Sequence, residues 1–174
     1  MKITNISVKA VEVPLTEPFH ISLGTIYNAV SCVVRVETDE GLVGWGEGAP
    51  GVLITGENRD GCIASIREHL APALIGCDPT DLEKVYWIMD RAVASHGPCG
   101  KTALDIACHD LLGKKGGLPV YKLLGGERTT SRPISPWASI SRRSWRPRQP
   151  LMLSRASMSS RPRWAPVPRR TLPA

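Results

Sequence analysis

An abrupt change in composition after Thr130 sets the limits on what this chain can fold into. Residues 1–130 hold 12 of the 22 lysines and arginines and all 16 acidic residues, which gives a formal net charge of −4. Residues 131–174 hold 10 arginines, no lysine and no acidic residue, which gives a formal net charge of +10. This second segment has too few apolar side chains to bury a core, so we expect it to be irregular or disordered. A folded domain must therefore be built from about the first 125 residues.

The start of the chain carries a strand pattern. Apolar and polar residues mostly alternate over residues 3–13 and the alternation stops at Pro14, which predicts a first strand that ends there. The run AVSCVVRVETDEGLVGWGE, residues 29–47, alternates on both sides of the turn sequence Asp-Glu-Gly, which predicts a β-hairpin. We expect these three strands to form a small antiparallel sheet.

The apolar spacing becomes helical after the hairpin. We expect Thr55 to cap a first helix that ends near Pro72, and Asp78 to cap a second helix. The second helix carries an apolar stripe made of Leu82, Val85, Tyr86, Met89 and Val93.

A third helix is predicted over residues 101–115, with Gly113 or Gly116 closing it. Its inward positions are Leu104, Ala107, Cys108 and Leu111. Strands followed by helices indicate an α+β fold class, with a three-stranded antiparallel sheet followed by a helical bundle.

Cysteine usage and hydropathy bear on the cellular setting. The five cysteines are an odd number without a CxxC pair, which indicates neither a disulfide framework nor a zinc cluster, and the four histidines are scattered. We therefore predict no metal site, and a reduced, cytoplasmic setting. No run approaches 18 apolar residues and the N-terminus lacks a signal-peptide pattern, so we expect neither export nor a membrane span.

Two short motifs suggest chemistry but have simpler interpretations. GEGAPG, residues 46–51, matches a dinucleotide-binding fingerprint, but Pro50 and the irregular run after it argue against a helix opening there. We interpret it as a glycine-rich exit from the hairpin. Cys108-His109-Asp110 resembles a nucleophile with its base, but adjacent helix residues point in different directions. A packed cysteine beside a solvated histidine is the favoured interpretation.

The basic segment leaves an alternative function open. Its arginines with Trp137, Trp145 and Trp164 combine cations for phosphates with rings for base stacking. A small binding module with a basic RNA-binding tail is thus the alternative hypothesis. A stretch without selected function is equally compatible with this composition, and on that interpretation no specific nucleic acid is bound.

Several stretches of residues 1–126 together resemble one known family. They are PF after the first strand, GWGEGAP after the hairpin, ITGEN, and GKTALDIACHDLLGKKGGLPVYKLLGG. As a set they resemble the N-terminal capping domain of the enolase superfamily, in its muconate-lactonizing subgroup (mandelate racemase/muconate lactonizing enzyme family), and within it the dipeptide epimerases. The resemblance implies a cap that closes over a small carboxylate or dipeptide substrate, in a family that is often homo-oligomeric.

The resemblance also implies where the chemistry lies. A (β/α)₇β barrel carries two catalytic lysines and three acidic ligands for Mg²⁺, which stabilises the developing enediolate. We expect this barrel to be missing, so no catalytic residue, no metal ligand and no bound Mg²⁺ are expected in this chain.

The substrate-binding residues implied by the resemblance lie in two capping loops. They are Phe19, His20, Ile21, Gly24, Thr25 and Ile26 in the first loop, and Ile54 and Thr55 in the second. Packing within the cap is an equal alternative for Phe19 and Ile21. Gly24 departs from the arginine that Ala-Glu epimerases often carry in this loop, which disfavours a glutamyl dipeptide.

The basic segment is compatible with a shifted translation of the missing barrel. When the last base of each codon is joined to the first two of the next, SRPISPWASIS from Ser131 permits a hidden ETDITLGIDK. MSSRPRWAPVPRRTL from Met158, together with the last base of the codon before it, permits DVIKAKVGAGPKKDI in the same frame. These strings resemble the first barrel strand and the K-x-K strand of dipeptide epimerases.

We therefore interpret residues 1–126 as the capping domain and residues 127–174 as an out-of-frame tail. On this hypothesis the chain is a truncated, inactive member of an Mg²⁺-dependent racemase or epimerase family. A bare cap that assembles with a barrel made elsewhere is a third possibility.

Overall fold

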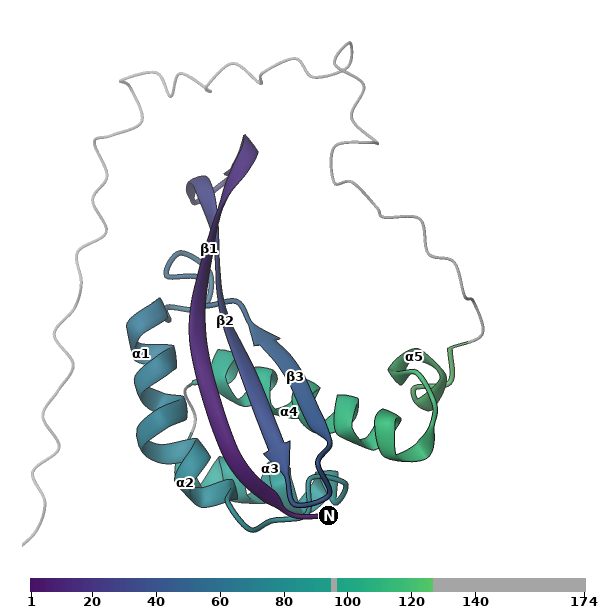
Figure 1. Ribbon diagram of the computed structural model, residues 1–174. Coiled ribbons are helices and arrows are strands. Elements are labelled where there is room, and N and C mark those ends of the chain that lie inside the picture. Colours follow the sequence, from purple (N-terminus) through teal and green to yellow (C-terminus); the bar gives the residue numbers. More distant parts are fainter. Residues whose placement is uncertain (95–96, 127–174) are drawn as a thin grey trace, which may run out of the picture. The chain divides into compact units, whose positions relative to one another are not determined.

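The computed structural model describes residues 1–94 and 97–126, which form a sheet covered by helices (Figure 1). The strands are β1 (Ile3–Ile21), β2 (Gly24–Thr38) and β3 (Val43–Gly48). They form one antiparallel sheet in the order β1-β2-β3, which confirms the predicted hairpin and sheet. Residues 127–174, where an irregular or disordered tail was expected, lie outside the described residues.

The prediction that the first strand ends at Pro14 is wrong. β1 pairs with β2 up to Pro14, opposite Asn28, and pairs again from Phe19, opposite Ile26, with a register irregularity between the two stretches. Because β1 lies at the edge of the sheet, proline can sit there without removing a hydrogen bond from the ladder. β1 and β2 consequently continue beyond β3 as a long two-stranded arm (Figure 1).

The first helix begins and ends later than predicted. It comprises α1 (Arg59–Ala64), a π-helical segment (Ser65–Leu70) and α2 (Ala71–Leu74) in direct succession. Its N-cap is Asn58, whose side-chain oxygen accepts the Gly61 N–H at 2.7 Å, so Thr55 is not the cap. The chain passes through Pro72 without ending the helix, because the widened π turn before it relaxes the usual clash of a proline ring with the preceding turn.

The second predicted helix is α3 (Leu82–Ala92), and its cap is Asp81 rather than Asp78. The Asp81 carboxylate accepts the Lys84 N–H at 3.3 Å, whereas Asp78 accepts the N–H and hydroxyl of Thr80 in the turn before the helix. Val85 and Met89 of the predicted stripe are buried, and Leu82 and Val93 pack against the core. Tyr86 is 55% exposed, so its assignment to the stripe is wrong.

The third predicted helix is α4 (Pro98–Gly116), followed by the short α5 (Val120–Leu123). All four residues predicted to face inward from α4 are buried. The closing residue is Gly117, with a left-handed φ of 65°, and not Gly113 or Gly116. Left-handed backbone at a helix C-terminus favours glycine, and three glycines close together in sequence could not be told apart by that rule.

The core lies between one face of the sheet and the helices. Alternate residues of β2, Cys32, Val34 and Val36, are fully buried there, and α4 packs on β2 and β3. No helix opens at the glycine-rich run after β3, which confirms its interpretation as a hairpin exit. Among the described residues, no helix has the length and hydropathy needed to span a membrane.

Candidate functional site

A hollow lies between the two-stranded arm and the loop that follows β3; we call it the arm hollow. Its apolar wall comes from β2 and from the loop, and consists of Ile26, Ala29, Val30, Ala49, Pro50, Val52, Leu53 and Ile54. Its polar rim comes from β2, the end of β3 and the start of α1, and includes Asn28, Ser31, Glu47, Asn58, Arg59 and Asp60. The hollow therefore offers an apolar surface with a polar border.

The arm hollow brings together part of the predicted substrate-binding set. Ile26 from the first predicted loop and Ile54 from the second line it together, although 28 positions separate them in sequence. Gly24 lies beside the same loop, since a Cβ added there would come within 3.1 Å of Leu53 Cδ1. The remaining residues of the first loop are not among those that line the hollow.

Those remaining residues form the tip of the arm. Phe19, His20 and Ile21 pair in register with Ile26, Thr25 and Gly24. His20 Nδ1 and Thr25 Oγ1 lie 2.9 Å apart, which joins the two strands across the tip. Phe19 and Ile21 are half-buried, as packing within the cap would require.

Thr55 holds the loop in shape. Its hydroxyl donates to the Gly51 carbonyl at 3.2 Å and accepts the Glu57 N–H at 3.4 Å. Glu57 in turn accepts the Cys99 N–H at 3.1 Å, which ties the loop to the start of α4. The threonine side chain thus supports the loop that carries Ile54.

Val52 and Leu53 were missed by sequence reasoning. Both are exposed, at 65% and 48%, and together with Ile54 they form a run of three large apolar residues. Three consecutive exposed apolar residues are unusual on a surface loop, and that run was the signal available in the sequence.

The charged side chains on the rim each contact a polar or charged neighbour. Arg59 Nε lies 2.8 Å from Asp60 Oδ1, and this contact raises the pKa of Arg59 and lowers the pKa of Asp60. Glu12 accepts the Asn28 side-chain amide at 2.7 Å, and Glu47 accepts the Ser31 hydroxyl. The rim arginine is therefore already paired with a carboxylate.

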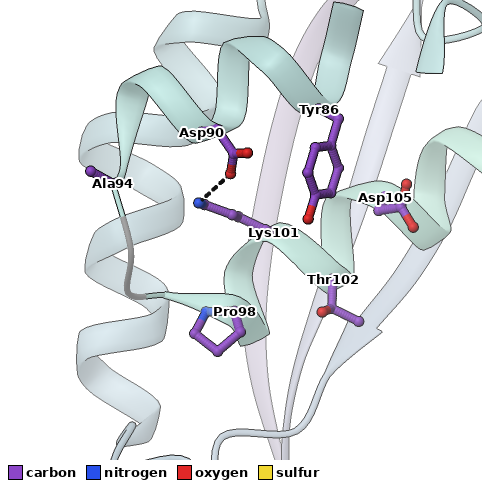
Figure 2. Close-up of a pocket in the computed structure, with 7 residues that line it drawn as sticks. All are labelled: Tyr86, Asp90, Ala94, Pro98, Lys101, Thr102 and Asp105. Carbon is purple, nitrogen blue, oxygen red and sulfur yellow. Dashed lines mark hydrogen bonds and ion pairs between the residues drawn. The ribbon is translucent and has the colours of Figure 1, made fainter. Parts of the chain in front are cut away.

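A second hollow lies between α3 and α4 (Figure 2). Lys101 Nζ lies 2.7 Å from Asp90 Oδ1, and the tyrosine ring of Tyr86 projects over the same space. The Lys101 ammonium therefore joins α4 to α3 through this ion pair. None of the residues implied by the family resemblance lies here.

Cys108, His109 and Asp110 diverge from one another. Cys108 is buried, and burial raises the pKa of its thiol to about 12, so it is not a poised nucleophile. His109 Nδ1 lies 3.0 Å from the Asp105 carbonyl oxygen, and Asp110 accepts the Trp45 N–H at 2.9 Å. The packed cysteine is confirmed, but the histidine is half-buried rather than fully solvated.

The described residues do not fit a magnesium site. Within residues 1–94 and 97–126, no three histidine, cysteine or acidic side chains come together in an arrangement that could hold a metal ion. The ligands for such an ion would have to come from elsewhere.

Comparison with known proteins identifies what these residues resemble. Residues 3–125 match the family model described as mandelate racemase/muconate lactonizing enzyme, N-terminal domain. A hydrophobic dipeptide epimerase of Enterococcus faecalis is 48% identical over 126 residues, which are 72% of this chain and 35% of the relative. An N-succinyl-L-Arg/Lys racemase of Bacillus cereus is 41% identical over 141 residues, which are 81% of this chain and 38% of the relative.

Solved structures agree with these matches. The E. faecalis dipeptide epimerase, crystallised with Mg and the dipeptide L-Leu-L-Tyr, gives a TM-score of 0.69 at 48% identity, covering 72% of this chain and 35% of that one. The B. cereus racemase gives 0.70 at 43% identity, covering 74% and 34%. The chain thus spans about a third of the length of the curated relatives it matches.

Proposed function

Because the chain belongs to the mandelate racemase/muconate lactonizing enzyme family of the enolase superfamily, we propose that residues 1–126 are the substrate-covering cap of an Mg²⁺-dependent epimerase or racemase. The substrate we propose is a hydrophobic dipeptide or a similar carboxylate. The observation that carries this proposal is the arm hollow, whose wall is apolar and is built from both capping loops.

The chemistry of the wall favours an apolar substrate side chain. Burying a leucine-sized side chain against such a wall contributes about 1.5–3 kcal/mol of binding free energy. A glutamyl side chain would need a free cation instead, but position 24 is a glycine and Arg59 is already paired with Asp60. The relatives named for dipeptides support the same substrate class.

The cap contributes binding and shielding. Apolar side chains of the arm and the loop would hold the substrate in a fixed orientation and exclude water from it. Removing a proton next to a carboxylate requires a base and stabilisation of the oxyanion, and Mg²⁺ supplies that stabilisation in enzymes of this kind. The described residues hold no ligand set for the ion, so the chemical step belongs to a barrel domain.

We further propose that residues 127–174 are an out-of-frame tail and that the chain alone is inactive. The family model describes an N-terminal domain and matches residues 3–125, and lysines and acidic residues are absent from residues 131–174. The two hidden strings in the shifted frame support this interpretation. A cytoplasmic location remains a prediction.

The test is α-proton exchange in deuterated water. The chain as it stands, with Mg²⁺ and hydrophobic dipeptides such as Leu-Tyr, should exchange no α-protons above a metal-free control. A gene with one base added near codon 130 should open the barrel frame, and its product should exchange Leu-Tyr in preference to Ala-Glu.

A variant in the arm hollow and a control variant outside it test whether the arm hollow binds the substrate. In the frame-restored protein, Ile54→Glu should raise the KM for Leu-Tyr and leave kcat less affected, whereas Tyr86→Glu, at the hollow between α3 and α4, should change neither. Exchange by the unaltered chain would contradict the claim of inactivity. Stop codons in the frame reached by adding one base would contradict the out-of-frame tail, and a preference for Ala-Glu would contradict the substrate class.

A further inference from the structure

The outer edge of β3 is held by two side chains of α4. Residues 43, 45 and 47 direct their backbone groups away from β2, because residues 42 and 44 use theirs within the hairpin. The Trp45 N–H donates to Asp110 Oδ2 at 2.9 Å, and Lys114 Nζ donates to the Val43 carbonyl at 2.6 Å. Asp110 and Lys114 also contact each other at 2.7 Å. We call this closed set of contacts the edge clamp.

The edge clamp occupies the place of a neighbouring strand. A strand laid beside β3 would offer a carbonyl to the Trp45 N–H and an N–H to the Val43 carbonyl. Asp110 and Lys114, one helical turn apart on α4, supply that acceptor and that donor with their carboxylate and ammonium groups. Charged groups at an edge also oppose the approach of a second chain, because pairing would remove them from water.

β1, at the opposite edge of the sheet, also forms hydrogen bonds with groups outside the sheet. Arg67 of the π-helical segment donates to the Val8 carbonyl of β1 at 3.3 Å. The N–H and carbonyl of Ile3 bond to Cys77 and Gly76 at 2.9 and 2.8 Å. Groups from the helical layer thus bond to parts of both edges.

The outer edge of β3 is only partly covered by the edge clamp. The Trp45 carbonyl and the Glu47 N–H make no hydrogen bond to any described residue. Beside this edge lies a hollow whose apolar lining is Trp45, Ile106, Val120 and Leu124, and whose polar lining includes Asp110 and Lys114. Trp45 is 50% and Leu124 is 70% exposed. An unguarded strand beside exposed apolar side chains is a site for pairing with an identical strand.

We propose that the Asp110–Lys114 clamp closes the outer edge of β3 against strand pairing with a second copy of this chain. Loss of the clamp leaves the Val43 carbonyl and the Trp45 N–H without partners. Antiparallel pairing of two β3 strands then satisfies both groups and brings the two Trp45 side chains together.

The test compares two double variants of the full chain. Asp110→Ala with Lys114→Ala removes the clamp. Asp90→Ala with Lys101→Ala removes an ion pair of the same length, 2.7 Å, that joins α3 to α4 away from any strand. Sedimentation velocity over a concentration series gives the self-association constant of each protein in one buffer. Hydrogen exchange of the peptides that contain Trp45 and Glu47 reports whether the β3 edge is covered.

The self-association constant of the clamp variant should exceed that of the unaltered chain by about tenfold or more. Its β3 amides should become more protected from hydrogen exchange as the protein concentration rises. The control variant should behave as the unaltered chain. Lys114→Met, which keeps the Asp110–Trp45 hydrogen bond, is measured alongside in case the double variant does not fold, and should show a smaller increase of the same kind. A folded clamp variant with unchanged association, or association without protection of β3, would overturn the proposal.

Discussion

Glycine at alternate positions of β3 sets the distance between the sheet and α4. A Cβ on Gly46 would collide with the carbonyl oxygen of Ala103, and one on Gly44 or Gly48 would meet the backbone of the same helix. Backbone cannot move aside as a flexible side chain can, so each of these positions admits only glycine.

Gly46→Ala should therefore lower the free energy of unfolding by about 3 kcal/mol, at the upper end of typical overpacking costs. Gly116→Ala is the matched control, because a Cβ there meets nothing within 4 Å and alanine favours helix. Denaturant unfolding followed by circular dichroism measures both. Equal stabilities of the two variants would show that α4 does not lie against β3 as described.

Burial of Cys108 links stability to alkaline pH. Its pKa is raised to about 12, whereas a thiol in an unfolded chain titrates near about 8.5. Between these values the unfolded chain loses the proton and the native chain keeps it. The free energy of unfolding should therefore fall with pH by up to about 1.4 kcal/mol per pH unit for this thiol.

Cys108→Ala should accordingly make the free energy of unfolding less steeply dependent on pH between about pH 9 and about pH 10.5. Val85→Ala, which removes buried atoms but no titratable group, serves as the control and should leave the slope as in the unaltered chain. Urea unfolding at several pH values gives the slopes. A slope unchanged by the loss of Cys108 would mean that this thiol is accessible to water in the native state.

At the scale of the elements, the strand pattern was readable from sequence and the helix caps were not. Alternation over residues 29–47 reports burial on one face of a sheet, and that signal is local. Asn58 and Thr55 are both acceptable caps, and only the path of the loop decides that Asn58 reaches a free N–H. The proximity of Ile26 and Ile54 depends on how the arm meets the loop, which no local pattern contains.

Asn58→Ala should lower the free energy of unfolding by about 1 kcal/mol, because the Gly61 N–H loses its acceptor at the start of α1. Thr55→Ala removes a hydroxyl that acts within the loop, so it should cost less, about 0.5 kcal/mol. Thermal or denaturant unfolding of the two variants ranks them. A larger loss of unfolding free energy for Thr55→Ala than for Asn58→Ala would indicate that Thr55 is the N-cap.

At the scale of the whole molecule, the described residues form a cap with open apolar surface. Leu23, Val52, Ile54 and Leu124 are each more than 60% exposed. Scattered apolar residues are ordinary on a surface, but these gather at the arm, the loop beside it and the end of α5. That distribution fits a domain whose loops and C-terminal end meet a substrate or another domain.

The charge of residues 131–174 permits a last prediction about the whole chain. Ten arginines without an acidic neighbour will bind polyanions whether or not selection placed them there. Such binding releases counterions, so affinity for single-stranded RNA should fall steeply and linearly in log–log terms as salt rises, with little preference among sequences.

A tail selected for RNA binding should behave differently, because it would keep a specific component of about 10³-fold or more over nonspecific competitor, by analogy with dedicated DNA-binding proteins. Competition binding of the full chain, and of a version ending at Gly126, against several unrelated strands at two salt concentrations separates the two cases. We expect only the salt-sensitive component, and only in the chain that carries the arginines. A sequence preference of that size that persists at the higher salt concentration and requires residues 127–174 would favour the RNA-binding alternative over an out-of-frame tail.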